Sequence, residues 1–80
     1  MKTKNDIIIK ISFLFIFNGL KELKLRNAIT ILDEHTKETH IVTSIKYDGL
    51  DILVVCDDNQ EYNLNDLDYL ELMLIANQIL

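Results

Sequence analysis

The stretch that decides the fold is IVTSIKYDGLDILVVC, residues 41–56. Its two halves are rich in β-branched and apolar residues, which favour strands. Asp48 and Gly49 stand between the halves, and Asp-Gly is typical of a two-residue type I′ hairpin. In that register Tyr47 lies opposite Leu50, and the apolar side chains of both strands share one face. The stretch therefore predicts an antiparallel pair of strands.

Further elements flank this hairpin on both sides. Residues 23–31 alternate between apolar and polar side chains, which predicts a strand, and the polar residues 33–38 predict the turn that follows it. Downstream, residues 57–59 predict a three-residue turn, because asparagine at its third position tolerates the left-handed conformation. Asn65 then predicts the N-cap of a C-terminal helix over residues 66–80, where the period of two ends.

The N-terminal segment 7–17 is open to two interpretations. Every odd position in it is large and apolar, and this period of two predicts a strand that a loop at Asn18 and Gly19 joins to the next strand. The alternative is a helix that ends at Asn18, with Gly19 as its C′ residue and Leu20 as the apolar residue after it. We expect the strand, because the segment is rich in β-branched and aromatic residues.

Together these elements predict an α+β fold in a single domain, residues 1–80, with an antiparallel meander of four or five strands followed by one C-terminal helix. This order of strands and turns before a helix resembles the small SH3-like barrels that carry an added C-terminal helix. The resemblance implies a sheet that closes on itself.

Composition narrows the class of protein. Apolar residues make up 49 % of the 80 residues and charged residues 26 %, with two glycines and no proline, which excludes a disordered or collagen-like chain. Cys56 is the single cysteine, so a disulfide framework and a multi-cysteine zinc site are excluded, and we expect a cytoplasmic location. The apolar run 7–17 is too short to cross a bilayer, which takes about 20 residues as helix, so we expect no membrane partner.

Few residues offer chemistry. His35 and His40 stand in a turn rich in carboxylates, but their H-x4-H spacing matches no helical or zinc-finger pattern, and the sequence leaves open whether this turn binds a metal. Cys56 alternates with apolar strand residues, which indicates a core position rather than an activated thiolate. We therefore predict no catalytic residue, no metal ligand and no cofactor, and a protein that is not an enzyme.

Charge is divided between the two parts of the sequence. Residues 1–46 hold eight basic and five acidic residues, a net charge of +3, whereas residues 47–80 hold eight acidic and no basic residues, a net charge of −8. This asymmetry predicts that the acidic half binds a basic protein partner. The residues expected to contact that partner are Asp57, Asp58, Glu61, Asp66, Asp68 and Glu71.

A nucleic acid is the alternative partner. Four basic residues fall on even strand positions and would share the outer face of the sheet, where they could bind phosphates. They are Lys10, Lys24, Arg26 and Lys46. In the expected registers Lys10, Arg26 and Lys46 stand directly opposite one another on three strands. This face predicts the alternative function, a small nucleic-acid-binding or ribosome-associated protein.

The leading function is a non-enzymatic protein-interaction module that self-associates. Apolar residues occupy both faces of the predicted sheet, and one helix covers only part of the second face. Exposed apolar patches of roughly several hundred Å² usually mark an interface. A twofold homodimer is the commonest closed assembly. We expect it to bury the even positions of the first strand or the helix flank around Met73, Ile79 and Leu80.

Overall fold

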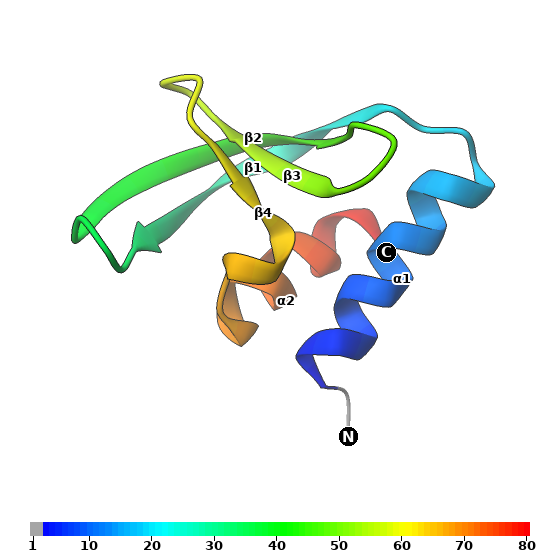
Figure 1. The fold of residues 1–80 in the computed structure, drawn as a ribbon, viewed down its shortest axis with the longest axis horizontal. Helices are drawn as coiled ribbons and strands as arrows, with labels where there is room; N and C mark the ends of the chain where they lie inside the picture. Colours follow the sequence, from blue (N-terminus) through cyan, green and yellow to red (C-terminus); the bar gives the residue numbers. More distant parts are fainter. Residues whose placement is uncertain (1–2) are drawn as a thin grey trace.

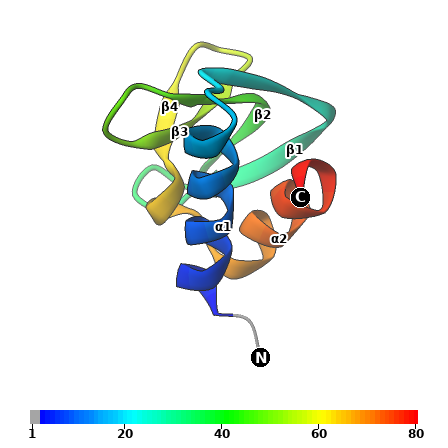
Figure 2. The ribbon, with the colours of Figure 1, turned by 90° about the vertical axis from the view of Figure 1, so that its right-hand side faces the viewer.

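Two helices cover one face of a four-stranded antiparallel sheet in the computed structural model, which describes residues 3–80 (Figure 1). The strands pair in sequence order, and Figure 2 shows both helices on the same side of the sheet. The α+β class and the antiparallel meander are confirmed, with four strands; residues 1 and 2 of the predicted domain lie outside the described residues. In chain order the elements are α1 (Lys4–Phe17), β1 (Glu22–Asp33), β2 (Glu38–Tyr47), β3 (Ile52–Cys56), β4 (Glu61–Asn63), the 3-10 turn η1 (Leu64–Asp66) and α2 (Tyr69–Ile79).

The strand predicted for residues 7–17 is wrong, because this segment lies within helix α1. A capping box holds the first turn of the helix. The hydroxyl of Thr3 accepts the N–H of Asp6 at 3.2 Å, and the carboxylate of Asp6 accepts the N–H of Thr3 at 3.0 Å. This N–H also holds the pKa of Asp6 below its usual range. Two orphan backbone donors are thus satisfied where the helix begins.

The end of α1 follows the helical alternative. Gly19 adopts φ +63°, and its N–H donates to the carbonyl of Ile16 at 3.3 Å. The N–H of Leu20 donates to the carbonyl of Phe15 at 2.9 Å. These two bonds define a Schellman motif, and glycine adopts its left-handed conformation without steric cost. The chain turns here toward β1.

Burial explains why the helix forms instead of a strand. Ile7, Ile11 and Phe15 are four residues apart, lie on one side of α1 and are at most 2 % exposed. A strand would place Phe13 and Phe17 on that same face, but they are 51 % and 76 % exposed. The period of two in the sequence therefore does not match the burial. It arises because α1 carries large apolar residues on nearly all sides.

The central hairpin forms, but its loop has four residues rather than two. Tyr47 pairs with Ile52, so the predicted pairing of Tyr47 with Leu50 is wrong. The carboxylate of Asp48 accepts two N–H groups of the loop, at 2.9 and 2.7 Å, and this side-chain turn competes with the type I′ turn. Gly49 adopts φ +95° within the loop. The three-residue turn at residues 57–59 is confirmed.

The C-terminal helix begins later than predicted. Asn65 is not its N-cap but lies within η1. Helix α2 begins after Asp68, whose carboxylate accepts the N–H of Glu71 at 2.8 Å in a second capping box. Leu64 and Leu67 explain the delay, because both are buried and the chain turns sharply between them before the helix starts.

β1 and β4 form the two edges of the sheet and do not pair with each other within residues 3–80. The sheet is therefore open, and the SH3-like barrel is not confirmed. α2 protects the long edge of β1. The amide of Gln78 accepts the N–H of Asn27 at 2.9 Å and donates to its carbonyl at 2.8 Å, and Glu71 accepts the N–H of Leu32 at 2.9 Å. These side chains occupy backbone groups that a further strand would otherwise pair with.

The helices and the inner face of the sheet enclose one hydrophobic cluster. Every strand except the short β4 contributes buried residues to it, as do α1, α2 and the segment between β4 and α2. Its buried members are Ile7, Ile11, Phe15, Leu25, Ile29, Ile31, Val42, Ile45, Ile52, Val54, Cys56, Leu64, Leu67, Leu72, Ile75 and Ala76.

Candidate functional site

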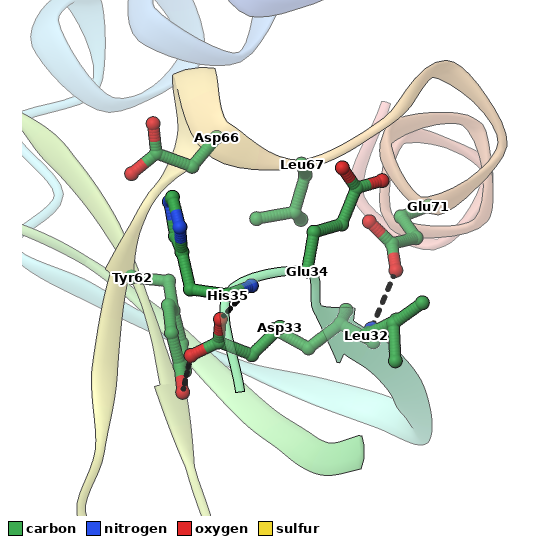
Figure 3. Close-up of a pocket in the computed structure, with 9 residues that line it drawn as sticks. Leu32, Asp33, Glu34, His35, Tyr62, Asp66, Leu67 and Glu71 are labelled. Carbon is green, nitrogen blue, oxygen red and sulfur yellow. Dashed lines mark hydrogen bonds between the residues drawn. The ribbon is translucent and has the colours of Figure 1, made fainter. Parts of the chain in front are cut away.

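A cavity of about 240 Å³ opens where the β1–β2 turn meets η1 and α2 (Figure 3). Carboxylates are the commonest charged groups in its lining. Asp33 and Glu34 come from the end of β1 and the turn after it, Asp66 from η1 and Glu71 from α2. The other lining residues are Ile31, Leu32, His35, Tyr62 and Leu67. The cavity therefore combines negative charge with apolar walls.

Two of these carboxylates already stabilise the fold. Asp33 accepts the hydroxyl of Tyr62 at 3.1 Å and the N–H of His35 at 2.9 Å (Figure 3). The N–H of His35 is the main reason that the pKa of Asp33 lies below its usual range. Burial and the bond to Asp33 raise the pKa of Tyr62 to about 12, so its hydroxyl remains a donor at neutral pH. Glu71 in turn accepts the N–H of Leu32 at the edge of β1.

The four carboxylates of the cavity favour a positively charged occupant. Within residues 3–80, no group of three or more His, Cys, Asp or Glu side chains is placed to hold a metal ion. Cys56 is a free thiol in the core, and burial raises its pKa to about 11. A thiol that stays protonated at neutral pH is a poor nucleophile.

The two histidines lie in different surroundings. His35 lines the cavity, whereas His40 is 9 % exposed on β2. Nδ1 of His40 lies 2.8 Å from a carboxylate oxygen of Asp58, and its ring lies 5.3 Å from the ring of Tyr62. Its Nε2 lies 3.8 Å from the carboxylate of Glu38. The His40–Asp58 contact therefore connects β2 to the β3–β4 turn.

The acidic residues predicted to contact a partner lie in several places. Asp66 and Glu71 line the cavity, whereas Asp57 and Asp58 lie in the β3–β4 turn, where Asp58 holds His40. Asp68 caps α2. The structure thus brings together two of the six predicted residues, and contact with a basic partner stays a prediction.

The predicted row of basic residues does not form. Lys10 lies on α1 rather than on a strand, so the register that placed it opposite Arg26 and Lys46 is wrong. Lys46 binds the sixth predicted acidic residue, Glu61, at 2.7 Å across the sheet. Lys24 and Arg26 are exposed on β1. Nucleic-acid binding stays a prediction.

Most of the exposed large apolar side chains belong to the two helices. Of the eleven that are exposed within residues 3–80, nine lie on α1, on α2 and the residue after it, or in the β2–β3 loop. These nine, called the apolar face below, are Ile9, Phe13, Ile16, Phe17, Leu50, Tyr69, Leu70, Leu74 and Leu80. The other two, Leu32 and Ile41, lie on the sheet.

Two shallow depressions connect parts of the apolar face. Phe13, Phe17 and Leu80 line one of about 380 Å³, which joins α1 to the end of α2. Ile16 and Leu50 line another of about 170 Å³, which joins α1 to the β2–β3 loop. The 14 residues of α1 include three charged ones and the 11 residues of α2 include one. Helices that lie on the surface of a domain normally carry more charge on their outer side.

Sequence reasoning missed most of this face. The strand prediction buried Phe13 and Phe17 in the core, and of the apolar face only Ile16, at an even position of that strand, and the flank near Leu80 were expected at an interface. A signal was present, since Thr3 and Asp6 have the spacing of a capping box and precede an apolar run. A helix drawn from that cap places the two phenylalanines on the side opposite Ile11.

No family model, no curated protein sequence and no solved structure matches this chain. Across residues 3–80, no helix has the length and hydropathy needed to cross a membrane. The function is therefore inferred from the surface and the cavity alone.

Proposed function

We propose that this chain is a non-enzymatic protein-interaction module that self-associates through the apolar face. The observation that carries the proposal is the location of the exposed large apolar residues: of eleven among residues 3–80, nine lie on α1, on α2 and the residue after it, or in the β2–β3 loop. Soluble monomers rarely expose large apolar patches, because water contact with them costs free energy that association removes.

The size of the apolar face supports a stable contact. Its nine side chains are between 45 % and 84 % exposed. If a large side chain presents about 150 Å² in full, together they present roughly 800 Å². The largest apolar patch on a typical monomer covers about 300 to 600 Å². A partner in a standard interface contributes about 800 Å², so this face is large enough for one.

Other routes of association are less favourable. Gln78 and Glu71 occupy backbone groups along the edge of β1, and the opposite edge strand, β4, has three residues. Short or covered edges disfavour the addition of a strand from another chain. The sheet's outer face also carries fewer exposed large apolar residues, since only Leu32 and Ile41 are found there among residues 3–80.

Self-association through the α1 part of the apolar face leaves the acidic cavity accessible. The β1–β2 turn that forms the cavity and helix α1 lie at opposite ends of the molecule in Figure 1. A basic protein partner, as the charge asymmetry predicts, would bind at the cavity end. A cytoplasmic location belongs to the same proposal, and the unpaired thiol of Cys56 supports it.

Sedimentation equilibrium tests self-association directly. We expect the mass to rise with concentration from 9.3 kDa toward twice that value. Phe17→Lys places a charge in the apolar face at an exposed position and should restore the monomer. Ile41→Lys is the matched control, because Ile41 is an exposed apolar residue on the sheet. A wild-type mass of 9.3 kDa up to about 100 µM would refute the proposal, since a weaker dimer than that has little occupancy.

A further inference from the structure

The exposed side of α1 is symmetrical about Phe13. Ile9, Phe13 and Phe17 follow one another at intervals of four residues, which places them on one side of the helix, and all three are exposed. Phe13 therefore has a large apolar neighbour one turn before it and another one turn after it. An antiparallel twofold pair centred on Phe13 matches this arrangement, because it places Ile9 of each copy against Phe17 of the other.

We propose that the partner of the apolar face is a second copy of this chain, bound with its α1 antiparallel to the first α1 and with Phe13 on the twofold axis. This inference rests on the proposed function. In this arrangement Ile9 of each copy contacts Phe17 of the other, and the two Phe13 rings meet at the centre. The residues of α2 in the apolar face flank the contact.

Electrostatics favours antiparallel over parallel packing. The last turn of α1 carries no basic residue, so the negative end of its helix dipole has no side-chain counter-charge there. With Phe13 on the axis, an antiparallel partner places its Lys10 level with Ile16, in the last turn of the first α1, and Lys10 lies beside Phe13 and Phe17. Parallel packing would place like ends together.

The aromatic residues supply the contact energy at the centre. Within one copy the rings of Phe13 and Phe17 are 5.1 Å apart and tilted by 36°, a favourable aromatic arrangement. An antiparallel pair joins two such pairs into a cluster of four rings. Phe17, at 76 % exposed, is the most exposed of the large apolar residues of α1.

Disulfide cross-linking of variants that each carry one introduced cysteine tests this geometry. Phe13→Cys should form a disulfide-linked dimer with oxidised glutathione, because the two substituted residues face each other across the axis. Phe17→Cys should not, since its two copies lie roughly 12 Å apart along the helices, beyond the limit of about 7 Å for a disulfide. The wild type is the background control, because its one cysteine, Cys56, is buried.

A mixture of two variants gives the second readout. Ile9→Cys mixed with Phe17→Cys should cross-link, although neither does so alone, and both variants retain Phe13. This mixture decides the question if Phe13→Cys weakens the dimer itself. Non-reducing electrophoresis measures all the products, and circular dichroism confirms that each variant is folded.

Each result separates the geometry from the self-association. Equal cross-linking of Phe13→Cys and Phe17→Cys indicates parallel helices and refutes the antiparallel pair. A dimer by sedimentation without cross-links at either readout refutes the geometry while the proposed function stands. A monomer refutes both. A monomer that floats with phosphatidylcholine vesicles also refutes both, and it assigns the apolar face to a lipid surface.

Discussion

Phe15→Ala tests the packing of α1 more directly than any other single substitution. Phe15 has no exposed surface and belongs to the cluster between the helices and the sheet. Removal of its ring leaves a cavity that the surrounding side chains of the sheet and α2 fill only in part. Phe17→Ala is the matched control, because it removes the same ring from the same helix at a position that is 76 % exposed.

The expected difference between the two variants is large. A buried Phe→Ala substitution costs about 3 to 5 kcal/mol, whereas an exposed one changes stability by less than about 0.5 kcal/mol. Domains of this size have a total stability of about 4 to 12 kcal/mol. Phe15→Ala should therefore lower the Tm by at least about 12 °C, or unfold the chain.

Urea unfolding followed by far-UV circular dichroism measures both variants. The experiment is repeated at two protein concentrations, because the contribution of Phe17 to self-association depends on concentration and the packing of Phe15 does not. Equal losses for Phe15→Ala and Phe17→Ala at the lower concentration would refute the helix. A strand with period two places both rings on one buried face and predicts that result.

Four further outcomes test other parts of the structure. Gly49→Val should cost roughly 1 to 2 kcal/mol in urea unfolding, because Gly49 has φ +95° and a β-branched residue is strained there; an unchanged midpoint would contradict this backbone conformation at Gly49. Gln78→Ala removes the side-chain partner of the Asn27 backbone. We expect the free energy of unfolding to fall by about 1 kcal/mol and aggregation, measured by light scattering, to become faster. Asn77→Ala is the control and should change neither. The Tm should fall as the pH drops below about 4. The pKa of Asp33 is lower in the folded chain than its value of 3.8 in the unfolded chain, so the unfolded chain binds more protons in this range. Asp33→Asn should make the fall in Tm shallower, and identical slopes would show that Asp33 does not cause it. Fluorescence anisotropy with labelled single-stranded RNA should show weak binding that is lost by about 150 mM salt. Tight binding at that salt concentration would favour the nucleic-acid alternative.

The sheet could be predicted from the sequence because its signals are local. Alternation in residues 23–31 and the turn at residues 57–59 depend only on neighbouring side chains, and the structure confirms both. The loop at Asp48 and Gly49 was wrong by two residues for an equally local reason. The Asp48 carboxylate binds loop N–H groups and so stabilises a longer loop than the dipeptide alone indicates.

The start of α2 shows a second limit. Asn65 and Asp68 are both good N-cap residues, and propensity cannot choose between them. The choice depends on Leu64 and Leu67, which are buried against elements from distant parts of the chain. Sequence alone does not show that both leucines must reach the core before the helix starts. The cavity was missed for the same reason, since its carboxylates come from residues 33–34, 66 and 71.

The error at α1 and the proposed function have one physical cause. A helix that needs only one buried stripe is expected to have polar residues on its other sides, and periodicity then identifies it. α1 buries the stripe of Ile7, Ile11 and Phe15 but also carries Phe13 and Phe17 on its exposed side. Those extra residues produced the false period of two. They add nothing to the core, and a fold without them would be more soluble. Exposed aromatic residues on a surface helix that do not stabilise their own chain indicate a contact with another molecule. Here we propose that this molecule is a second copy of the chain.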